Sequence, residues 1–213
     1  MNKVQTDPYI NMLLTIIRDN STQKQEIRDA IKTLGQIVGR RIYGDHYTSA
    51  KIVQTPMQQP YQGLVSRLAT TVVLSTRDDH EYFAAGIASV FDGCLRGYMD
   101  FSGARGEQAL NLPIQAASLP TPPVGQVVSN VIIAKSVLAT GCTAVSIARK
   151  AIELYRPEKI FLVSTFYSQR GLEEVNHQIY PRPEIYIIGE PDDLNSDGML
   201  VPGVGNLDQR LSS

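Results

Sequence analysis

Residues 131–144 read Val-Ile-Ile-Ala-Lys-Ser-Val-Leu-Ala-Thr-Gly-Cys-Thr-Ala, an apolar run followed by a turn of small residues. This order predicts a buried strand that passes through a tight turn into a helix. Within the turn, Gly141 lets the backbone approach an anion, and Thr140 and Thr143 offer hydroxyl groups. The N–H groups and the dipole of the following helix point at the same place. The segment therefore predicts a phosphate-binding turn. Its candidate residues are Leu138, Ala139, Thr140, Gly141, Cys142 and Thr143.

Three alternatives stay open around this turn. Small residues also fit an ordinary strand-to-helix crossover that binds no ligand. Cys142 is either a reactive thiol in the turn or a small side chain of the core. Lys135, just before the turn, either adds positive charge for an anionic ligand or ends the strand and pairs with a neighbouring Asp or Glu.

The composition excludes several classes of protein. The length of 213 residues suits one α/β domain, 1–213, with a substantial core. The net charge of −1 and the lack of a Lys/Arg run argue against nucleic acid as a partner. The sequence has no apolar stretch of about 18 residues and no apolar leader, so we expect a cytoplasmic protein without a membrane partner. Cys94 and Cys142 are too few for a disulfide framework or a zinc site, and no metal ligands are predicted.

Apolar spacing divides the chain into an N-terminal helical pair and an alternating region. In residues 1–44, Asp7-Pro8 predicts the start of one helix, and Ser21-Thr22 predicts the cap of a second, which is expected to end at Gly44. Beyond them, strand and helix patterns alternate, which predicts an α/β fold with a mostly parallel twisted sheet flanked by helices. Strands are expected at 51–55, 70–75, 94–99, 127–134, 159–164 and 184–188. Helices are expected at 81–91, 142–155 and 172–178.

Two segments interrupt this alternation. Residues 112–125 carry several prolines among small residues, which predicts a surface arm, with a polyproline ligand as the alternative. In residues 192–213, glycines and a proline predict no regular structure between residues 195 and 206. Such a C-terminal loop is expected to cover the ligand-binding end of an open α/β sheet, and a frayed tail is the alternative.

Other clusters of polar residues give weaker signals. The run Arg77-Asp-Asp-His-Glu81 is dense in charge and is interpreted as a solvated loop with a helix N-terminus, whose dipole favours its acids, with a catalytic patch as the alternative. His46, His80 and His177 share no ligand or triad spacing. No residue is therefore assigned as catalytic.

Three ordered regions resemble the uracil phosphoribosyltransferase family, namely an N-terminal region with two matching stretches, a central loop and a C-terminal tail, and together they span nearly the whole chain. Asp7-Pro-Tyr-Ile10 and Val53-Gln-Thr-Pro-Met57 are similar to the family's N-terminal helices and first strand. Leu138-Ala-Thr-Gly141 matches its phosphoribosyl-binding loop. Asp193-Leu-Asn-Ser-Asp-Gly-Met-Leu-Val-Pro-Gly-Val-Gly205 resembles its uracil-binding tail and is the most specific of the three. The chain is thus identified as a divergent member with the type I phosphoribosyltransferase fold.

The resemblance implies a reaction and its requirements. Family members transfer ribose 5-phosphate from phosphoribosyl pyrophosphate to uracil, giving UMP and pyrophosphate with Mg²⁺, and they form dimers or larger homo-oligomers. This chemistry needs cations for the leaving group and a carboxylate for the ribose hydroxyls. The base-binding residues that the resemblance implies are Met199, Leu200, Gly205 and Leu207.

The chain departs from the family pattern where those requirements are met. The family's Asp-Pro before the loop is Lys135-Ser136 here, so a hydrogen-bond acceptor has become a donor-only cation. The family's Arg-Ala-Gly corresponds to Ala84-Ala85-Gly86, which leaves Arg77 as the candidate replacement at the pyrophosphate site. Asn206 replaces a carboxylate of the tail and belongs to the same candidate site.

These departures predict impaired turnover. A charge pair at about 4 Å is worth about 4 kcal/mol at an effective dielectric constant of roughly 20, so two losses would remove several orders of magnitude in rate. We expect a protein that binds UMP, phosphoribosyl pyrophosphate or a related phosphorylated metabolite. The alternatives are an active, Mg²⁺-dependent enzyme with a rearranged site, and a non-catalytic homo-oligomeric scaffold for a protein partner.

Overall fold

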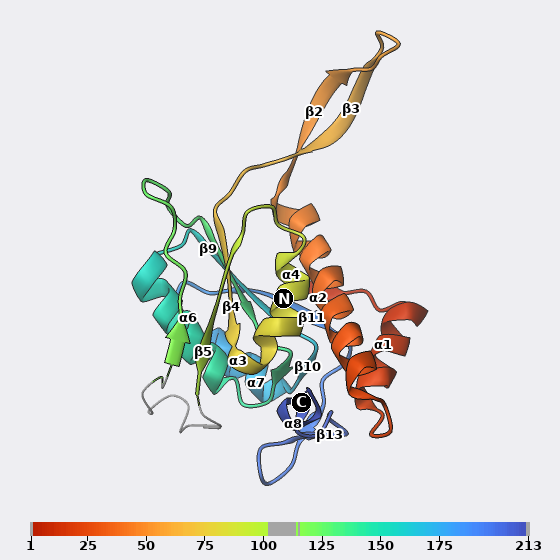
Figure 1. Ribbon diagram of the computed structural model, residues 1–213, viewed down its shortest axis with the longest axis vertical. Helices are drawn as coiled ribbons and strands as arrows, with labels where there is room; N and C mark the ends of the chain where they lie inside the picture. Colours follow the sequence, from red (N-terminus) through yellow and green to blue (C-terminus); the bar gives the residue numbers. More distant parts are fainter. Residues whose placement is uncertain (1, 102–113, 115, 212–213) are drawn as a thin grey trace.

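The computed structural model describes residues 2–101, 114 and 116–211 (Figure 1). Its centre is a seven-stranded sheet, in which the long continuous apolar runs of the sequence form the middle strands. The strands are β1 (Asn2–Val4), β4 (Thr71–Thr76), β5 (Leu95–Asp100), β6 (Ala116–Ser118), β7 (Asn130–Ala134), β9 (Lys159–Ser164) and β11 (Glu184–Ile188). Their order is β1-β11-β9-β7-β4-β5-β6, and only β6 runs antiparallel to its neighbour. The predicted mostly parallel α/β sheet is confirmed.

Helices cover both faces of the sheet, as Figure 1 shows. One face packs against α1 (Pro8–Arg18), α2 (Lys24–His46) and α4 (Ala85–Ala88), and the other against α6 (Cys142–Tyr155) and α7 (Gln169–Gln178). Successive residues of a strand enter opposite cores, as Val72 and Val73 of β4 do. This double burial explains why β4 and β7 show no polar alternation.

The N-terminal helical pair forms with small differences from the prediction. Asp7 caps α1, since its carboxylate accepts a hydrogen bond from Ile10 N at 2.8 Å, and Pro8 takes the first helical position. The N-cap of α2 is Gln23 rather than Ser21 or Thr22, and α2 continues past Gly44 to His46. Gly44 does not end α2 because it does not adopt the positive φ of a terminating glycine, and its carbonyl accepts a hydrogen bond from the Thr48 hydroxyl.

The helix expected at 81–91 is divided. A short helix α3 (Arg77–Asp79) leads into a π-helical turn η1 (His80–Ala84) and then α4. Ala84 and Gly86, at the positions of the family's arginine motif, are buried against α2. A β-carbon on Gly86 would lie 2.1 Å from Lys32 O, so this segment serves close helix packing.

A β-ribbon of β2 (Thr48–Gln54) and β3 (Pro60–Ser66) projects from the body of the molecule (Figure 1). The sequence predicted one strand at 51–55 and missed its partner. The ribbon turns at residues 55–59, where Gln58 has a φ of 59°. Large apolar side chains on it are exposed, including Ile52 at 68% and Leu64 at 71%.

The segments expected to be irregular contain short elements. Of the predicted arm 112–125, residues 112, 113 and 115 lie outside the described residues, and β6 pairs with β5 at the sheet edge. In the tail, the expectation of no regular structure between residues 195 and 206 is wrong, since β13 (Leu200–Val201) pairs with β12 (Asp193–Leu194). The tail then ends in α8 (Leu207–Leu211). Within the described part of the chain, no helix is long and apolar enough to span a membrane.

Tyr155 ties the end of α6 to the proline-rich segment, and this contact gives a pH-dependent prediction. Its hydroxyl donates a hydrogen bond to Pro120 O at 2.8 Å, and burial raises the pKa of Tyr155 from 10.0 to about 12. The unfolded chain therefore ionises first, so the contribution is complete below pH 10 and is lost as the pH rises toward 12. Near neutral pH, Tyr155→Phe should lower the free energy of unfolding by about 1 kcal/mol, and this difference should shrink as the pH rises from 10.0 to about 12. Urea unfolding of both proteins over a pH series tests this, and a pH-independent difference would contradict it.

Candidate functional site

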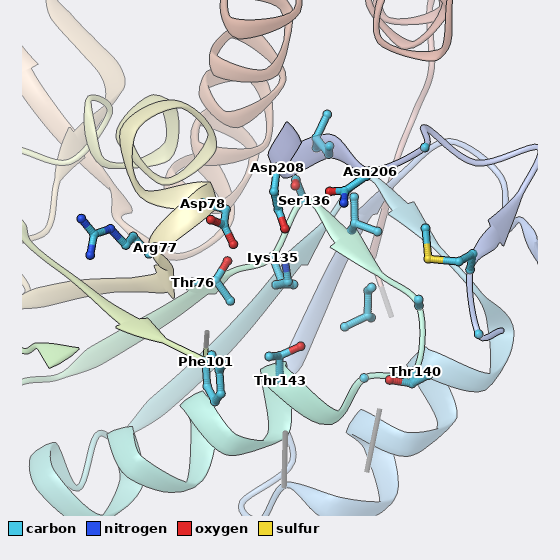
Figure 2. A pocket seen from close by; sticks show the side chains of 18 of the residues that line it. Thr76, Arg77, Asp78, Phe101, Lys135, Ser136, Thr140, Thr143, Asn206 and Asp208 are labelled. Carbon is cyan, nitrogen blue, oxygen red and sulfur yellow. The ribbon is translucent and has the colours of Figure 1, made fainter. Parts of the chain in front are cut away.

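A cavity of about 380 Å³ opens at the carboxyl ends of β4, β5 and β7. This is the edge where an open parallel sheet usually binds its ligand. The segments that line it come from the ends of β4 and β5, the 135–143 segment and the C-terminal tail (Figure 2). Of the residues proposed from the sequence, the cavity brings together Arg77, Lys135, Leu138, Ala139, Thr140, Gly141, Thr143, Met199, Gly205, Asn206 and Leu207.

Two of the proposed residues do not line the cavity. Cys142 is 5% exposed and packs into the core beneath the turn. Of the two alternatives for Cys142, the small side chain of the core is therefore the one observed. Leu200 is 9% exposed and belongs to the core on the α1–α2 face. Its neighbour Met199 lines the cavity instead.

The 138–143 turn has the geometry that an anion site requires. Gly141 has a φ of 82° and precedes α6 as its N-cap, with no side-chain hydrogen bond to the first turn. Thr140 and Thr143 face the cavity (Figure 2). A 14-residue helix thus presents its first N–H groups and its positive dipole end toward the cavity.

The start of α7 fixes this turn from behind. β8 (Val137–Leu138) pairs in parallel with β10 (Phe166–Tyr167), and Ser168 Oγ donates a hydrogen bond to Ala139 O at 2.5 Å. A β-carbon on Gly141 would lie 2.7 Å from Gly171 O, so the backbones approach within the space that only glycine leaves. The turn is therefore held rigidly in the conformation that faces the cavity.

Lys135 and Asp79 form a buried ion pair on the cavity wall. Lys135 Nζ lies 2.8 Å from Asp79 Oδ2, and the two side chains are 14% and 4% exposed. Asp79 also accepts hydrogen bonds from Thr76 Oγ1 at 3.1 Å, from Ser136 N at 3.3 Å and from the Ser136 hydroxyl. The structure therefore combines both alternatives for Lys135, since its ammonium pairs with an acid and also faces the cavity.

Carboxylates surround this ammonium. Asp78 and Asp208 line the cavity and turn toward Lys135 in Figure 2. Burial is the largest single influence on the pKa of Lys135 and lowers it, but Asp79, Asp208 and Asp78 together raise this pKa above its ordinary value. Partial burial raises the pKa of Asp78, and Asp208 adds to the rise. Lys135 is thus a permanent cation within an acidic wall.

Arg77 does not face the centre of the cavity. Its guanidinium lies 3.4 Å from Asp100 and over the Tyr98 ring, and its side chain is 63% exposed. Figure 2 shows it directed away from Lys135. The predicted replacement for the family's arginine is therefore engaged at the rim with a carboxylate.

Arginines clamp the C-terminal tail to α1. Arg18 contacts both oxygens of Asp192, at 2.9 and 3.0 Å, and donates to Gly203 O at 2.8 Å. Arg210 donates to Ile17 O and to Val204 O. These bonds hold the segment that carries the tail's cavity-lining residues.

Replacing Arg18, one of the two arginines of this clamp, should lower the stability of the protein. Arg18→Met should lower the free energy of unfolding by about 2 kcal/mol, because Asp192, whose side chain is 4% exposed, loses both charged hydrogen bonds. Arg41→Met is the matched control, since Arg41 is 59% exposed and pairs with Asp45 within one helix, and it should cost less than about 0.5 kcal/mol. Chemical denaturation measures the free energy of unfolding of both variants. Equal losses would mean that the Arg18–Asp192 pair contributes no more to stability than an exposed ion pair.

The sequence interpretation missed the acidic half of the site. The run 77–81 was expected to be solvated, which is wrong for Asp79. The signal was present, because the run directly follows the buried strand β4 and so lies at the same sheet edge as the end of β7. Asp78, Ser136 and Asp208 were likewise not proposed, and all three line the cavity.

The described residues do not form a magnesium site from protein side chains alone. Within residues 2–101, 114 and 116–211, no three His, Cys, Asp or Glu side chains are grouped to hold a metal. Asp79 already accepts bonds from Lys135, Thr76 and Ser136, which occupy its two oxygens. The position between Asp78 and Asp208, where a cation would be attracted, is adjacent to the Lys135 ammonium.

Comparison with known proteins adds independent information. Residues 4–212 match the family model described as uracil phosphoribosyltransferase. A uracil phosphoribosyltransferase of Natronomonas pharaonis is 27% identical over 203 residues, covering 92% of this chain and 89% of the relative. One of Pyrobaculum islandicum is 24% identical over 211 residues, covering 99% and 98%. Among solved structures, the AQ2163 protein from Aquifex aeolicus is 23% identical with a TM-score of 0.77, covering 98% of this chain and 97% of that one, which shows a shared fold.

Proposed function

This chain belongs to the uracil phosphoribosyltransferase family, and from that premise we propose that it binds a pyrimidine nucleotide such as UMP while its phosphoribosyl transfer is impaired or lost. The cavity supports binding at both ends of such a ligand. The 138–143 turn suits a 5′-phosphate, and the tail residues Met199, Gly205 and Leu207 suit the base.

One observation carries the proposed loss of turnover: the Lys135–Asp79 ion pair on the cavity wall. Where the family has a carboxylate for the ribose hydroxyls, this chain has a cation that cannot accept hydrogen bonds. The wall on that side carries Asp78 and Asp208, which repel a pyrophosphate, and Arg77 is turned to the rim. A leaving pyrophosphate therefore finds carboxylates where it needs cations.

Two other functions each have an observation in their favour. Arg77 is exposed and long enough to reorient toward a ligand, which favours an active enzyme with a rearranged, Mg²⁺-dependent site. The projecting β2–β3 ribbon exposes Ile52, Met57 and Leu64, which favours self-association into a dimer or larger scaffold that presents a protein-binding surface.

Calorimetric titration with UMP, uracil and phosphoribosyl pyrophosphate plus Mg²⁺, followed by an assay for UMP formation, separates these functions. We expect UMP to bind and turnover to be absent or several orders of magnitude below that of an active relative measured in parallel. Rapid UMP formation would refute the proposal and support the rearranged enzyme. No binding of any ligand, together with self-association in sedimentation, would support the scaffold.

A further inference from the structure

We infer that Asp78 accepts hydrogen bonds from the sugar hydroxyls of the bound nucleotide, so that this cavity selects a ribonucleotide over its 2′-deoxy analogue. The inference rests on the proposed function, because it concerns the ligand of the same cavity. It goes further by naming the sugar of that ligand and a side chain that recognises it.

The wall beside Lys135 is the expected place of the sugar. Lys135 stands where the family has its carboxylate for the ribose hydroxyls, and its side chain lies on the cavity wall. An ammonium group has only donors, and its nearest carboxylate, Asp79, already takes one of them at 2.8 Å. Acceptors for the ribose hydroxyls therefore have to come from a neighbouring residue.

The sheet brings Asp78 to this wall. β4 and β7 are adjacent and parallel, with Ser75 opposite Ala134, so the residues that follow them leave the sheet at the same edge. Asp78 lines the cavity and turns toward Lys135 in Figure 2, and its charge acts on the Lys135 ammonium. A carboxylate is thus present beside the position of the one that this chain lacks.

Asp78 has acceptor capacity that its neighbour Asp79 lacks. Asp79 is 4% exposed, and donors from Thr76, Lys135 and Ser136 occupy its two oxygens. Within residues 2–101, 114 and 116–211, no hydrogen bond or close ion pair engages the Asp78 carboxylate. An ionised carboxylate offers about four lone-pair sites, which is enough for the 2′- and 3′-hydroxyls together.

Two other acids of the cavity wall already serve cations. Asp100 lies 3.4 Å from Arg77 at the rim. Among the acids that raise the pKa of Lys135 against its burial, Asp79 acts most strongly, and Asp208 acts more strongly than Asp78. The charge of Asp208 is thus directed at the ammonium, which leaves Asp78 for a ligand.

The surroundings of Asp78 favour a hydrogen-bond donor from the ligand. Partial burial and, after it, the charge of Asp208 raise the pKa of Asp78. A hydroxyl that donates to the ionised carboxylate offsets this cost, and hydrogen bonds to a charged acceptor are stronger than those between neutral groups. A ligand without its 2′-hydroxyl should therefore bind about tenfold more weakly or worse.

The test is titration calorimetry of the whole protein with UMP and with 2′-deoxy-UMP. The two ligands share their phosphate and base, so the ratio of their dissociation constants reports the 2′-hydroxyl alone. We expect wild type to prefer UMP by at least about tenfold. Equal affinity for both ligands would overturn the inference and leave the proposed function standing.

A variant assigns this preference to the residue. In Asp78→Ala, the preference for UMP should fall below about threefold, whatever the absolute affinities become when one negative charge is removed. Asp197→Ala is the matched control, because Asp197 also lines the cavity. Asp197 adjoins Gly198, where an added β-carbon would lie 3.7 Å from Thr140, so it belongs to the end of the cavity beside the turn. Asp197→Ala should keep the wild-type ratio.

Thermal unfolding of each variant verifies that it is folded. A wild-type preference retained in Asp78→Ala, or an equal loss of preference in Asp197→Ala, would overturn the assignment to Asp78.

A second pair of ligands separates the inference from the proposed function. Ribose 5-phosphate and 2-deoxyribose 5-phosphate carry the same sugar difference without a base. We expect wild type to prefer ribose 5-phosphate and Asp78→Ala to lose this preference. If neither UMP nor 2′-deoxy-UMP bound but this preference appeared, the proposed nucleotide function would fall and the role of Asp78 would stand. Failure of all four ligands to bind would overturn both.

Discussion

Replacing Asp79 with alanine should lower the free energy of unfolding by about 3–5 kcal/mol. The reason is the environment of its partner. Lys135 is 14% exposed and would keep a buried charge without its 2.8 Å carboxylate. The hydroxyls of Thr76 and Ser136, both buried, would lose their acceptor at the same time. Denaturant unfolding measured by circular dichroism gives the change directly.

Two controls make this prediction specific. Glu153→Ala removes the acid of an exposed pair with Lys150 and should cost less than about 0.5 kcal/mol. The double variant Asp79→Ala with Lys135→Met removes both buried charges and should recover part of the stability lost in the single variant. If Asp79→Ala cost less than about 1 kcal/mol, the Lys135 ammonium would be exchanging with solvent, and the pair would not be fixed on the cavity wall.

Much of the fold was predictable because the middle strands are buried on both faces. Continuous apolar runs predicted the strands 159–164 and 184–188 with the bounds that the structure has. The helix 142–155, predicted to follow the small-residue turn, also has the expected bounds. At such positions, burial and local propensity demand the same structure. The β2–β3 ribbon was only half found, because its exposed strands carry no alternating pattern and its turn lacks the Asn-Gly or Asp-Gly signal.

The candidate site was predictable only where its residues are neighbours in the chain. The residues of the 138–143 turn are consecutive in the chain, and its glycine and threonines predict a turn that can face an anion. The Lys135–Asp79 pair joins residues 56 positions apart, and it follows from the parallel register of β4 with β7, which places Ser75 opposite Ala134. Asp79, in the run 77–81 that was predicted to be solvated, is therefore buried. Its burial depends on the pairing of β4 with β7, which the local sequence does not specify.

Replacing Gly141 with alanine should remove most UMP binding and lower the free energy of unfolding by about 2–4 kcal/mol. Two costs add at this position. Its φ of 82° is strained for any residue with a β-carbon, and that β-carbon would lie 2.7 Å from Gly171 O. Relief of this contact must move either the 138–143 turn or the start of α7. The N–H groups of α6 would then no longer converge on the phosphate.

Gly125 separates the two costs, because it has the same φ of 82° but no atom within 4 Å of an added β-carbon. Gly125→Ala should therefore cost only about 1–2 kcal/mol, the strain of a left-handed backbone, and should leave UMP affinity unchanged. Denaturant unfolding and calorimetric titration give the free energy of unfolding and the UMP affinity of each variant. If Gly141→Ala resembled Gly125→Ala in both measurements, the contact with Gly171 would not hold the turn. If Gly141→Ala lost stability but kept its affinity for UMP, the nucleotide's phosphate would bind elsewhere in the protein. The combined loss of stability and affinity is the result expected if the approach of these two backbones builds the anion site.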